Sequence, residues 1–297
     1  MCIRRLFLLL IVLSLWFVSQ ARAGLEEAIS TYDKGAYSEA YKEFKVLADQ
    51  GNAQAQLHLA YMKDLGQGVA RDQTEAMKWY LKAAEQGLDR AELALGLKYA
   101  GGIGIPQDYS QAKKWYTKAA EHGVPEAQCD LGLLYSQGRG VAQDKAEAAK
   151  WYRKSAENGY AMGQCNLGLL YARGEGLPQD YTEASKWFKK AAEQGYVKAQ
   201  YNLGIAFERG DGVPKDLQSA YMWFHLAASQ DDADAKSQID TITGQMTQQQ
   251  IAEGQRLAKQ WIPAEPDKQD LFPSSRSVGT GTENGMSMHK YGDDHGF

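Results

Sequence analysis

Apolar residues recur along this chain at helical spacing, in segments separated by glycine-containing loops. In one segment Ala199, Leu203, Gly204 and Phe207 lie at i, i+4, i+5 and i+8, which places them on one helical face. The segment before it carries a second stripe with helical spacing, made of Ala184, Trp187, Phe188, Ala191 and Ala192. The pattern predicts a helix on each side of the loop.

The whole unit repeats. Five tryptophans follow one another at intervals of 36 residues, namely Trp79, Trp115, Trp151, Trp187 and Trp223. Glycines keep the same phase at 51, 87, 123, 159 and 195, as do aspartates at 72, 108, 144, 180 and 216. A fixed period between 20 and 50 residues indicates a solenoid, a propeller or another array.

The loop and its borders have a recurring chemistry. A glycine pair such as Gly174 and Gly176 ends the first helix, because glycine tolerates the positive φ of a turn. An aspartate then begins the second helix, where its side chain can accept from a free N–H of the first turn. Three of these aspartates have a glutamate three residues later and predict capping boxes: Asp72 with Glu75, Asp144 with Glu147 and Asp180 with Glu183.

The repeated unit, A-Q-x-x-L-G-x-x-Y-x-x-G-x-G-V-x-x-D-x-x-x-A-x-x-W-Y-x-K-A-A-E-x-G, resembles the Sel1-like repeat, a relative of the tetratricopeptide repeat. The resemblance implies an all-α fold, an α/α solenoid whose helix pairs form a right-handed superhelix. We expect a tetratricopeptide-like first pair over 24–51 and two capping helices over 232–262, the second opened by a capping box of Thr247 and Gln250. Five repeats are expected between them, over 52–87, 88–123, 124–159, 160–195 and 196–231.

Both ends of the chain differ from the repeats. Arg4 and Arg5 precede an apolar run of 13 residues over 6–18, and Ala21-Arg22-Ala23 has the form of a signal peptidase site. Residues 1–23 are therefore expected to be a signal peptide cleaved after Ala23, with an uncleaved anchor as the alternative. This places the mature protein in the periplasm or outside the cell. Residues 263–297 have few large apolar residues and are expected to be disordered.

Charge and motifs exclude several classes of chemistry. The formal net charge is -4, without the basic excess of a nucleic-acid-binding protein. The five histidines form no metal-ligand spacing, and no hydrolase or phosphate-loop motif is present. We therefore expect no cofactor, no metal, no nucleic-acid partner, no membrane-spanning segment in the mature chain and no enzymatic activity. The chain is expected to be a monomer.

Two cysteines of the mature chain, Cys129 and Cys165, are one period apart. Equivalent positions on stacked repeats are separated by roughly 8–10 Å. A disulfide needs Cα atoms about 4.4–6.8 Å apart. The spacing favours two shielded free thiols over a strained bridge.

By analogy with the tetratricopeptide repeat, the first helices would line a concave groove that binds a protein segment. One predicted groove column is Leu57, Leu93, Cys129, Cys165 and Tyr201, with ordinary core as the alternative interpretation. A second column is polar and variable, comprising Gln54, Arg90, Glu126, Met162 and Lys198. A third column, Tyr61, Leu97, Leu133, Leu169 and Ile205, is interpreted as ordinary core.

These features favour a protein–protein interaction scaffold of the bacterial envelope, or a secreted one, that binds a partner segment in the groove. Sel1-like proteins are implied in complex assembly, envelope signalling, polysaccharide export and contact with hosts, and the sequence does not select among them. An alternative is a hydrolase or binding protein directed at cell-wall or β-lactam material. A purely structural role in the envelope is a third possibility.

Overall fold

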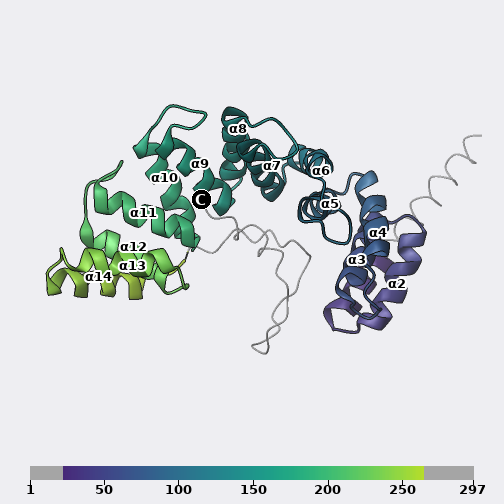
Figure 1. The fold of residues 1–297 in the computed structure, drawn as a ribbon. Helices are drawn as coiled ribbons and strands as arrows, with labels where there is room; N and C mark the ends of the chain where they lie inside the picture. The colour runs from purple at the N-terminus through teal and green to yellow at the C-terminus, as the bar shows by residue number, and fades with distance from the viewer. Residues whose placement is uncertain (1–22, 264–297) are drawn as a thin grey trace, which may run out of the picture. The chain divides into compact units, whose positions relative to one another are not determined.

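A computed structural model describes residues 23–263, and these residues form helices joined by loops, with no strand among them (Figure 1). The predicted all-α solenoid class is confirmed. The expected signal peptide falls outside the described residues except at Ala23, and the expected disordered tail does so except at Pro263. The described residues divide into two compact units, 23–112 and 113–263, and each is treated by itself.

The first unit begins with helical residues 23–33 and continues with four helices. These are α2 (Tyr37–Asp49), α3 (Ala53–Leu65), α4 (Gln73–Glu85) and α5 (Asp89–Gly101). Each packs against the next one along the chain. A further helix, α6 (Tyr109–Glu121), begins at the end of this unit and continues into the second unit.

The second unit continues the alternation of first and second helices. Its first helices are α7 (Pro125–Gln137), α9 (Ala161–Arg173), α11 (Val197–Arg209) and α13 (Ala233–Thr243), and its second helices are α8 (Lys145–Glu157), α10 (Tyr181–Glu193), α12 (Leu217–Ala228) and α14 (Gln248–Gln260). α7 also contacts α9, α11 contacts α13, and α14 packs against α12. Asn202 Nδ2 of α11 also lies 3.9 Å from Cys165 Sγ of α9, so the first helices form a layer in which neighbours touch.

The helix ends follow the predicted chemistry with one correction. Each in-phase aspartate caps a second helix; for example, Asp144 accepts from the backbone N–H of Glu147 at 2.9 Å. The capping box of Thr247 and Gln250 is confirmed. The three boxes proposed for the repeats are not: the glutamate carboxylates pair with lysines instead, as Glu183 does with Lys186 at 2.6 Å. A nearby ammonium offers a charged partner, so the glutamate turns away from the cap.

The second glycine of several loops has a packing role between repeats. At Gly176 and Gly212, which have φ values of 72° in both cases, an added Cβ would overlap the backbone of the second helix in the preceding repeat. At Gly212 the overlap is with the Tyr181 carbonyl and with Thr182 N. The loop thus lies directly on the start of the previous second helix, which only a residue without a side chain permits.

A row of buried glutamines joins successive repeats. Gln164 Nε2 donates to the Ala156 carbonyl at 3.2 Å, and its Oε1 accepts from Gln194 Nε2 at 2.8 Å. Gln56, Gln128 and Gln200 make the same kind of pair of contacts. Each glutamine therefore binds a carbonyl at the end of the preceding second helix that also accepts the N–H of the in-phase glycine, as Ala156 does from Gly159 at 3.1 Å. Burial costs little because both ends of the amide are paired.

Large and small residues interlock inside each pair. The predicted stripe on α10 is buried, and a Cβ at Gly168 would lie 2.7 Å from the Phe188 ring. Gly132 faces Tyr152 and Gly204 faces Phe224 in the same way. The glycine lets an aromatic ring lie flat against the first helix, so the small residue and the ring form one packing unit.

One ion pair is buried within the first unit. Lys98 Nζ lies 2.7 Å from Asp64 Oδ2, with side-chain exposures of 5% and 13%. Lys98 stands where other repeats place Met62, Leu134 and Leu170, and its ammonium lies 5.4 Å from the Tyr80 ring centroid. A charged residue at a core position is tolerated because the preceding repeat supplies its counter-ion.

Candidate functional site

The first predicted groove column is mostly core. Leu57, Leu93, Cys129 and Cys165 are 1–3% exposed, and Tyr201 is half-buried. The four buried side chains hold their helices against neighbours and are not presented to a partner. These four predicted contact residues therefore lie in the core, one position along the helix from the accessible residues.

The two cysteines are free, and both are buried. Burial raises the pKa of the Cys165 thiol to about 12 and also raises that of Cys129. Asn166 Nδ2 lies 3.6 Å from Cys129 Sγ, and Asn202 Nδ2 lies 3.9 Å from Cys165 Sγ. Protonated, shielded thiols are poor nucleophiles, so these cysteines act as packing residues.

The polar column lies at the surface. Gln54, Arg90, Glu126 and Met162 are half-buried, and Lys198 is exposed. The Ile205 column, interpreted from sequence as core, is also half-buried throughout. The more accessible apolar column is therefore the one next to the polar column, and not the one that contains the cysteines.

In α7, α9 and α11 the polar column and the Ile205 column belong to one stripe of four positions per helix, which we call the first-helix face. It occupies positions i, i+4, i+7 and i+11 of α7, α9 and α11, and all of its residues are half-buried or exposed. Its members are Glu126, Asp130, Leu133, Gln137, Met162, Asn166, Leu169, Arg173, Lys198, Asn202, Ile205 and Arg209. The α7 side chains differ from those of α9 and α11, which share an asparagine at i+4 and an arginine at i+11.

The α7 part of the face is acidic. Burial and, to a smaller extent, the nearby Glu126 carboxylate raise the pKa of Asp130 to about 7, against the opposing effect of a hydrogen bond to Tyr116. Asp130 stands in phase with Asn166 and Asn202. When protonated it is a neutral group of nearly the same shape as those amides.

Replacing Asp130 with asparagine should alter the pH dependence of stability. Between pH 4 and 7 the unfolded chain is ionised at this residue while the folded chain keeps its proton, so native stability falls as pH rises. We expect Asp130→Asn to be more stable than the native protein at pH 8, by about 2 kcal/mol or more, and equal to it below pH 4. Urea unfolding at both pH values measures this, with Asp240→Asn as the control.

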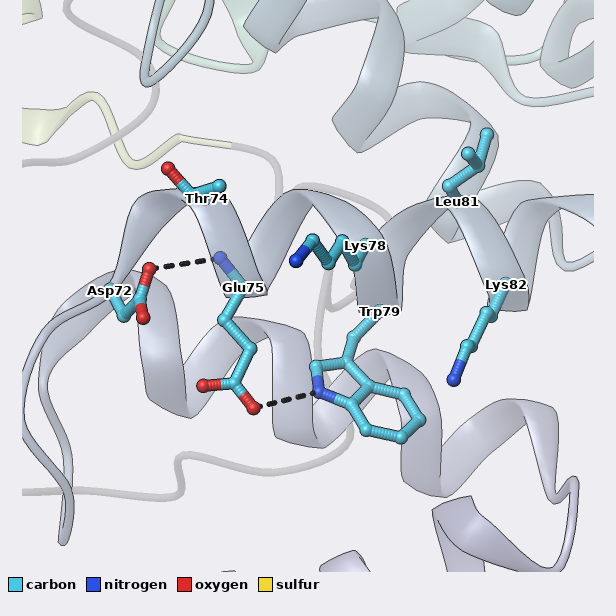
Figure 2. Close-up of a pocket in the computed structure, with 7 residues that line it drawn as sticks. All are labelled: Asp72, Thr74, Glu75, Lys78, Trp79, Leu81 and Lys82. Carbon is cyan, nitrogen blue, oxygen red and sulfur yellow. Dashed lines mark hydrogen bonds between the residues drawn. The ribbon is translucent and has the colours of Figure 1, made fainter.

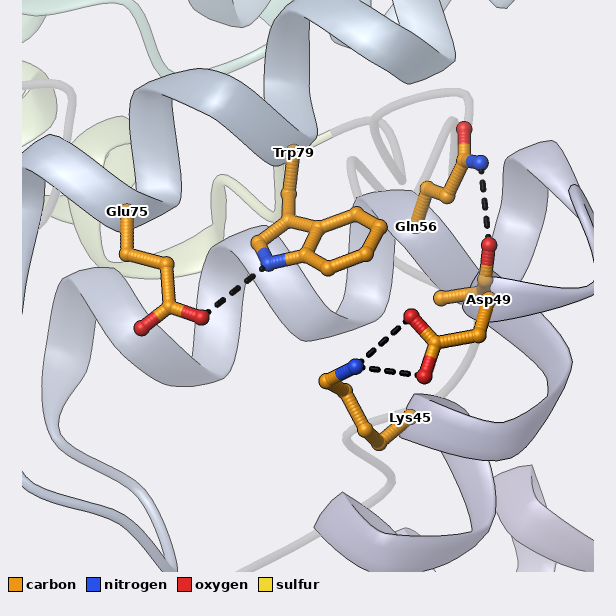
Figure 3. A network of polar contacts seen from close by, with 6 residues as sticks. Lys45, Asp49, Gln56, Glu75 and Trp79 are labelled. Atoms are coloured by element: carbon orange, nitrogen blue, oxygen red, sulfur yellow. Dashed lines mark hydrogen bonds and ion pairs between the residues drawn. The ribbon is translucent and has the colours of Figure 1, made fainter.

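The second helices present a more uniform surface. Lys82, Lys118, Lys154 and Lys190 lie 4.0–4.5 Å from the centroids of the preceding in-phase tryptophan rings. Figure 2 shows Lys82 beside Trp79, and Figure 3 shows that Glu75 accepts a hydrogen bond from the Trp79 indole N–H, at 3.5 Å. Lysine stems and ammonium groups thus cover the tryptophans in repeat after repeat, which is a structural role.

A surface hollow of about 510 Å³ lies beside Trp79 (Figure 2). Its seven lining residues, which include Asp72, Lys78 and Leu81, all come from α4 and its cap. Trp79 itself is 6% exposed. Because a single helix forms the hollow, no groups from other elements converge on it, and it has no arrangement typical of a ligand site.

His58 is a titratable group in the core of the first unit. Its ring stacks on Phe44 with centroids 4.5 Å apart, and its Nε2 is buried without a hydrogen-bond partner. Burial lowers the pKa of His58 to about 4, and Asp33 opposes this shift. The site has no catalytic arrangement, but it gives the fold a dependence on pH.

Between pH 6.5 and 4 the unfolded chain takes up a proton at His58 that the folded chain refuses, so stability falls as the solution becomes acidic. The expected contribution is about 3 kcal/mol. The His58→Asn variant should not show this loss of unfolding free energy between pH 7 and pH 4. The control His122→Asn changes an exposed histidine and should show the same loss as the native protein. Unfolding by urea at pH 7 and pH 4 gives both values; an unchanged acid loss in His58→Asn would contradict the assignment.

Among residues 23–263, no group of three or more His, Cys, Asp or Glu side chains could hold a metal ion. Within the same range, no helix is both long and apolar enough to cross a membrane.

Sequence reasoning missed three features. It did not place Asn166, Asn202 and Arg209 on the accessible face. Helical spacing could have found them, because the asparagines lie four residues, and Arg209 eleven residues, after members of the polar column. It did not notice Lys98, which breaks an apolar column of the repeat. It also missed the hydrogen bonds of the buried glutamines. These bonds depend on where the preceding helix ends in space, which helical periodicity does not predict.

Stacked helix pairs with a variable face on their first helices define a helical-repeat protein. The Sel1 repeat family model matches residues 53–88, 89–124, 125–160, 161–196 and 197–232, and the chain belongs to this family. Sel1 repeat proteins generally mediate protein–protein interaction, and their scaffold is generally non-catalytic.

Two solved structures resemble the chain. A Sel1 repeat protein from Oxalobacter formigenes is 32% identical, with a TM-score of 0.70 over 82% of this chain and 99% of that one. A protective antigen of uropathogenic Escherichia coli with an SLR fold is 26% identical, with a TM-score of 0.55 over 89% of this chain and 66% of that one. No curated protein matches the chain.

Proposed function

We infer that this protein is a scaffold that binds a protein partner through the first-helix face. The observation that carries the proposal is the contrast between the two layers of the second unit. Helices α8 and α10 repeat the same lysine and tryptophan pair, whereas the first-helix face changes in charge and shape from α7 to α11. Variation at accessible positions on a constant scaffold suits recognition of one particular partner.

The face also has the composition of an interface. Half-buried Met162, Leu169 and Ile205 provide apolar contact area beside polar groups that can fix orientation. The buried Leu93 is unsuitable for testing binding, because its truncation would damage the core. Substitutions should instead add bulk at the centre of the face without removing core atoms.

Crosslinking and capture from the native cell envelope test the proposal. We expect Asn166→Arg with Asn202→Arg to lose the partner that the native protein captures, because two long side chains cover the face. The matched control is Gln248→Arg with Gln249→Arg, which makes the same change on exposed positions of α14. If every partner survives the first pair of changes in a folded protein, the face is not the binding surface.

We further propose that the mature protein acts in the periplasm or outside the cell, on the basis of the N-terminal sequence pattern. The expected mature N-terminus is Gly24. N-terminal sequencing of protein isolated from the native cell checks this, and an intact Met1 in a cytoplasmic fraction would contradict it.

A further inference from the structure

The α9 and α11 parts of the first-helix face carry a local excess of positive charge on an acidic chain. Their eight positions are Met162, Asn166, Leu169, Arg173, Lys198, Asn202, Ile205 and Arg209, which include three cations and no acid. The chain as a whole has a formal net charge of -4. This patch therefore has the opposite sign to the protein that carries it.

Two of the cations have no counter-ion. Lys198 and Arg209 lie at the two ends of α11, are exposed, and form no ion pair with any residue of the range 23–263. The neighbouring Glu208 lies off the stripe and accepts a hydrogen bond from Gln238. By contrast, exposed lysines on the second helices are commonly paired, as Lys150 is with Glu147. The α11 cations are thus available to an external anion.

Two amides lie between the cations and the apolar positions. Asn166 and Asn202 direct Nδ2 toward the cysteine of the preceding first helix, and Asn202 Nδ2 also donates to the Lys198 carbonyl at 2.8 Å. Their Oδ1 atoms accept no hydrogen bond within the described part of the chain. These oxygens remain as acceptors for an N–H group of a ligand.

The spacing of these acceptors suits an extended polypeptide. Equivalent points on stacked helices are roughly 10 Å apart, and an extended chain rises about 3.3 Å per residue. Backbone N–H groups about three residues apart can therefore reach Asn166 and Asn202 in turn. Leu169 and Ile205, each one turn further along its helix, offer apolar contact to side chains of the same segment.

We propose that the α9–α11 part of the first-helix face binds an extended, acidic segment of a partner protein, with its carboxylates at Lys198 and Arg209 and its backbone N–H groups at Asn166 and Asn202. This inference rests on the proposed function and names the chemistry of the partner. The α7 part of the face has no cation among Glu126, Asp130, Leu133 and Gln137, so the carboxylates are placed at α11 and not at α7.

A display library of random 12-residue peptides, selected on the purified protein, tests the proposal. Selected peptides are expected to contain at least twice the input frequency of Asp and Glu. For a selected peptide, Lys198→Glu with Arg209→Glu should weaken binding at least tenfold in fluorescence anisotropy, and higher salt should weaken binding to the native protein. Lys189→Glu with Lys259→Glu makes the same charge change on exposed second-helix positions and should leave the affinity within twofold.

A second variant protects the test against misfolding. Asn202→Leu keeps the charge and should weaken binding severalfold, with an unchanged unfolding midpoint. Suppose that the selected peptides show no acidic enrichment but bind the Asn166→Arg with Asn202→Arg protein more weakly than the native protein. That result would overturn this inference and leave the proposed function standing. Absence of selected peptides would overturn this inference, while partner capture from the envelope decides the proposed function separately. Equal affinity for the Lys198/Arg209 and Lys189/Lys259 variants also overturns the inference.

Discussion

Lys98→Leu is expected to lower the free energy of unfolding by about 3–5 kcal/mol, although leucine is the residue that two other repeats carry at this position. The change leaves Asp64 charged and nearly buried, with its Oδ1 already lacking a hydrogen-bond partner. The double variant Asp64→Ala with Lys98→Leu should recover most of the loss, because no uncompensated charge remains. Urea unfolding monitored by tryptophan fluorescence measures all three proteins.

An exposed pair provides the control for this experiment. Lys45 and Asp49 form an ion pair with side-chain exposures of 38% and 52% (Figure 3). Lys45→Leu should change stability by no more than about 1 kcal/mol, because solvent screens the partner that is left behind. If the Asp64→Ala and Lys98→Leu double variant is as unstable as Lys98→Leu alone, the loss does not come from an uncompensated charge.

Gly212→Ala is expected to destabilise the second unit by about 3 kcal/mol or more, through two separate costs. The positive φ of 72° is unfavourable for alanine, by roughly 1–2 kcal/mol. The new methyl group also overlaps the Tyr181 carbonyl, so the loop must separate from the preceding repeat. Chemical denaturation of the purified variant gives the sum of the two.

Gly159→Ala isolates the first cost. Gly159 has a φ of 86°, and no atom lies within 4 Å of its added Cβ. It should therefore lose only the roughly 1–2 kcal/mol of the strained backbone. Equal losses in the two variants would show that the approach of the Gly212 loop to Tyr181 contributes nothing to stability.

The two units should respond to pH in opposite directions. His58 in the first unit loses stability as the solution becomes acidic, whereas Asp130 in the second unit loses stability as it approaches neutrality. The contributions of His58 and Asp130 to the free energy of unfolding therefore change in opposite directions between pH 4 and 6.5.

The fold was predictable because its signals are local and repeated. Trp187, Ala191 and the capping Asp180 each have one plausible role in a helix pair, and the structure gives them that role. The accessible face was harder to predict, because neighbouring positions on a helix are turned by about 100°. Cys165 and Asn166 are adjacent in sequence, yet one is core and the other belongs to the face.

Interactions between repeats could not be obtained from periodicity. The roles of Glu75 and Glu183 depend on which lysines come within reach, so a capping-box pattern did not decide them. The bond from Gln164 to Ala156 joins residues of different repeats, and its formation depends on how the repeats stack. Such contacts follow from the assembled array and from no single unit.

The buried ion pair also constrains how this array can change in length. Suppose that a copy of the unit 124–159 were inserted after residue 87. Its Leu134 would then occupy the position beside Asp64 that Lys98 now occupies, and Lys98 would lie one repeat further away from Asp64. Both would then lie buried without a counter-ion. Insertion of a repeat between the first two is therefore disfavoured unless both charges are lost together. The later repeats carry the uncharged Leu134 and Leu170 at this position, so insertion there separates no such pair. The pair fixes the order of two neighbours in an array whose units otherwise look exchangeable.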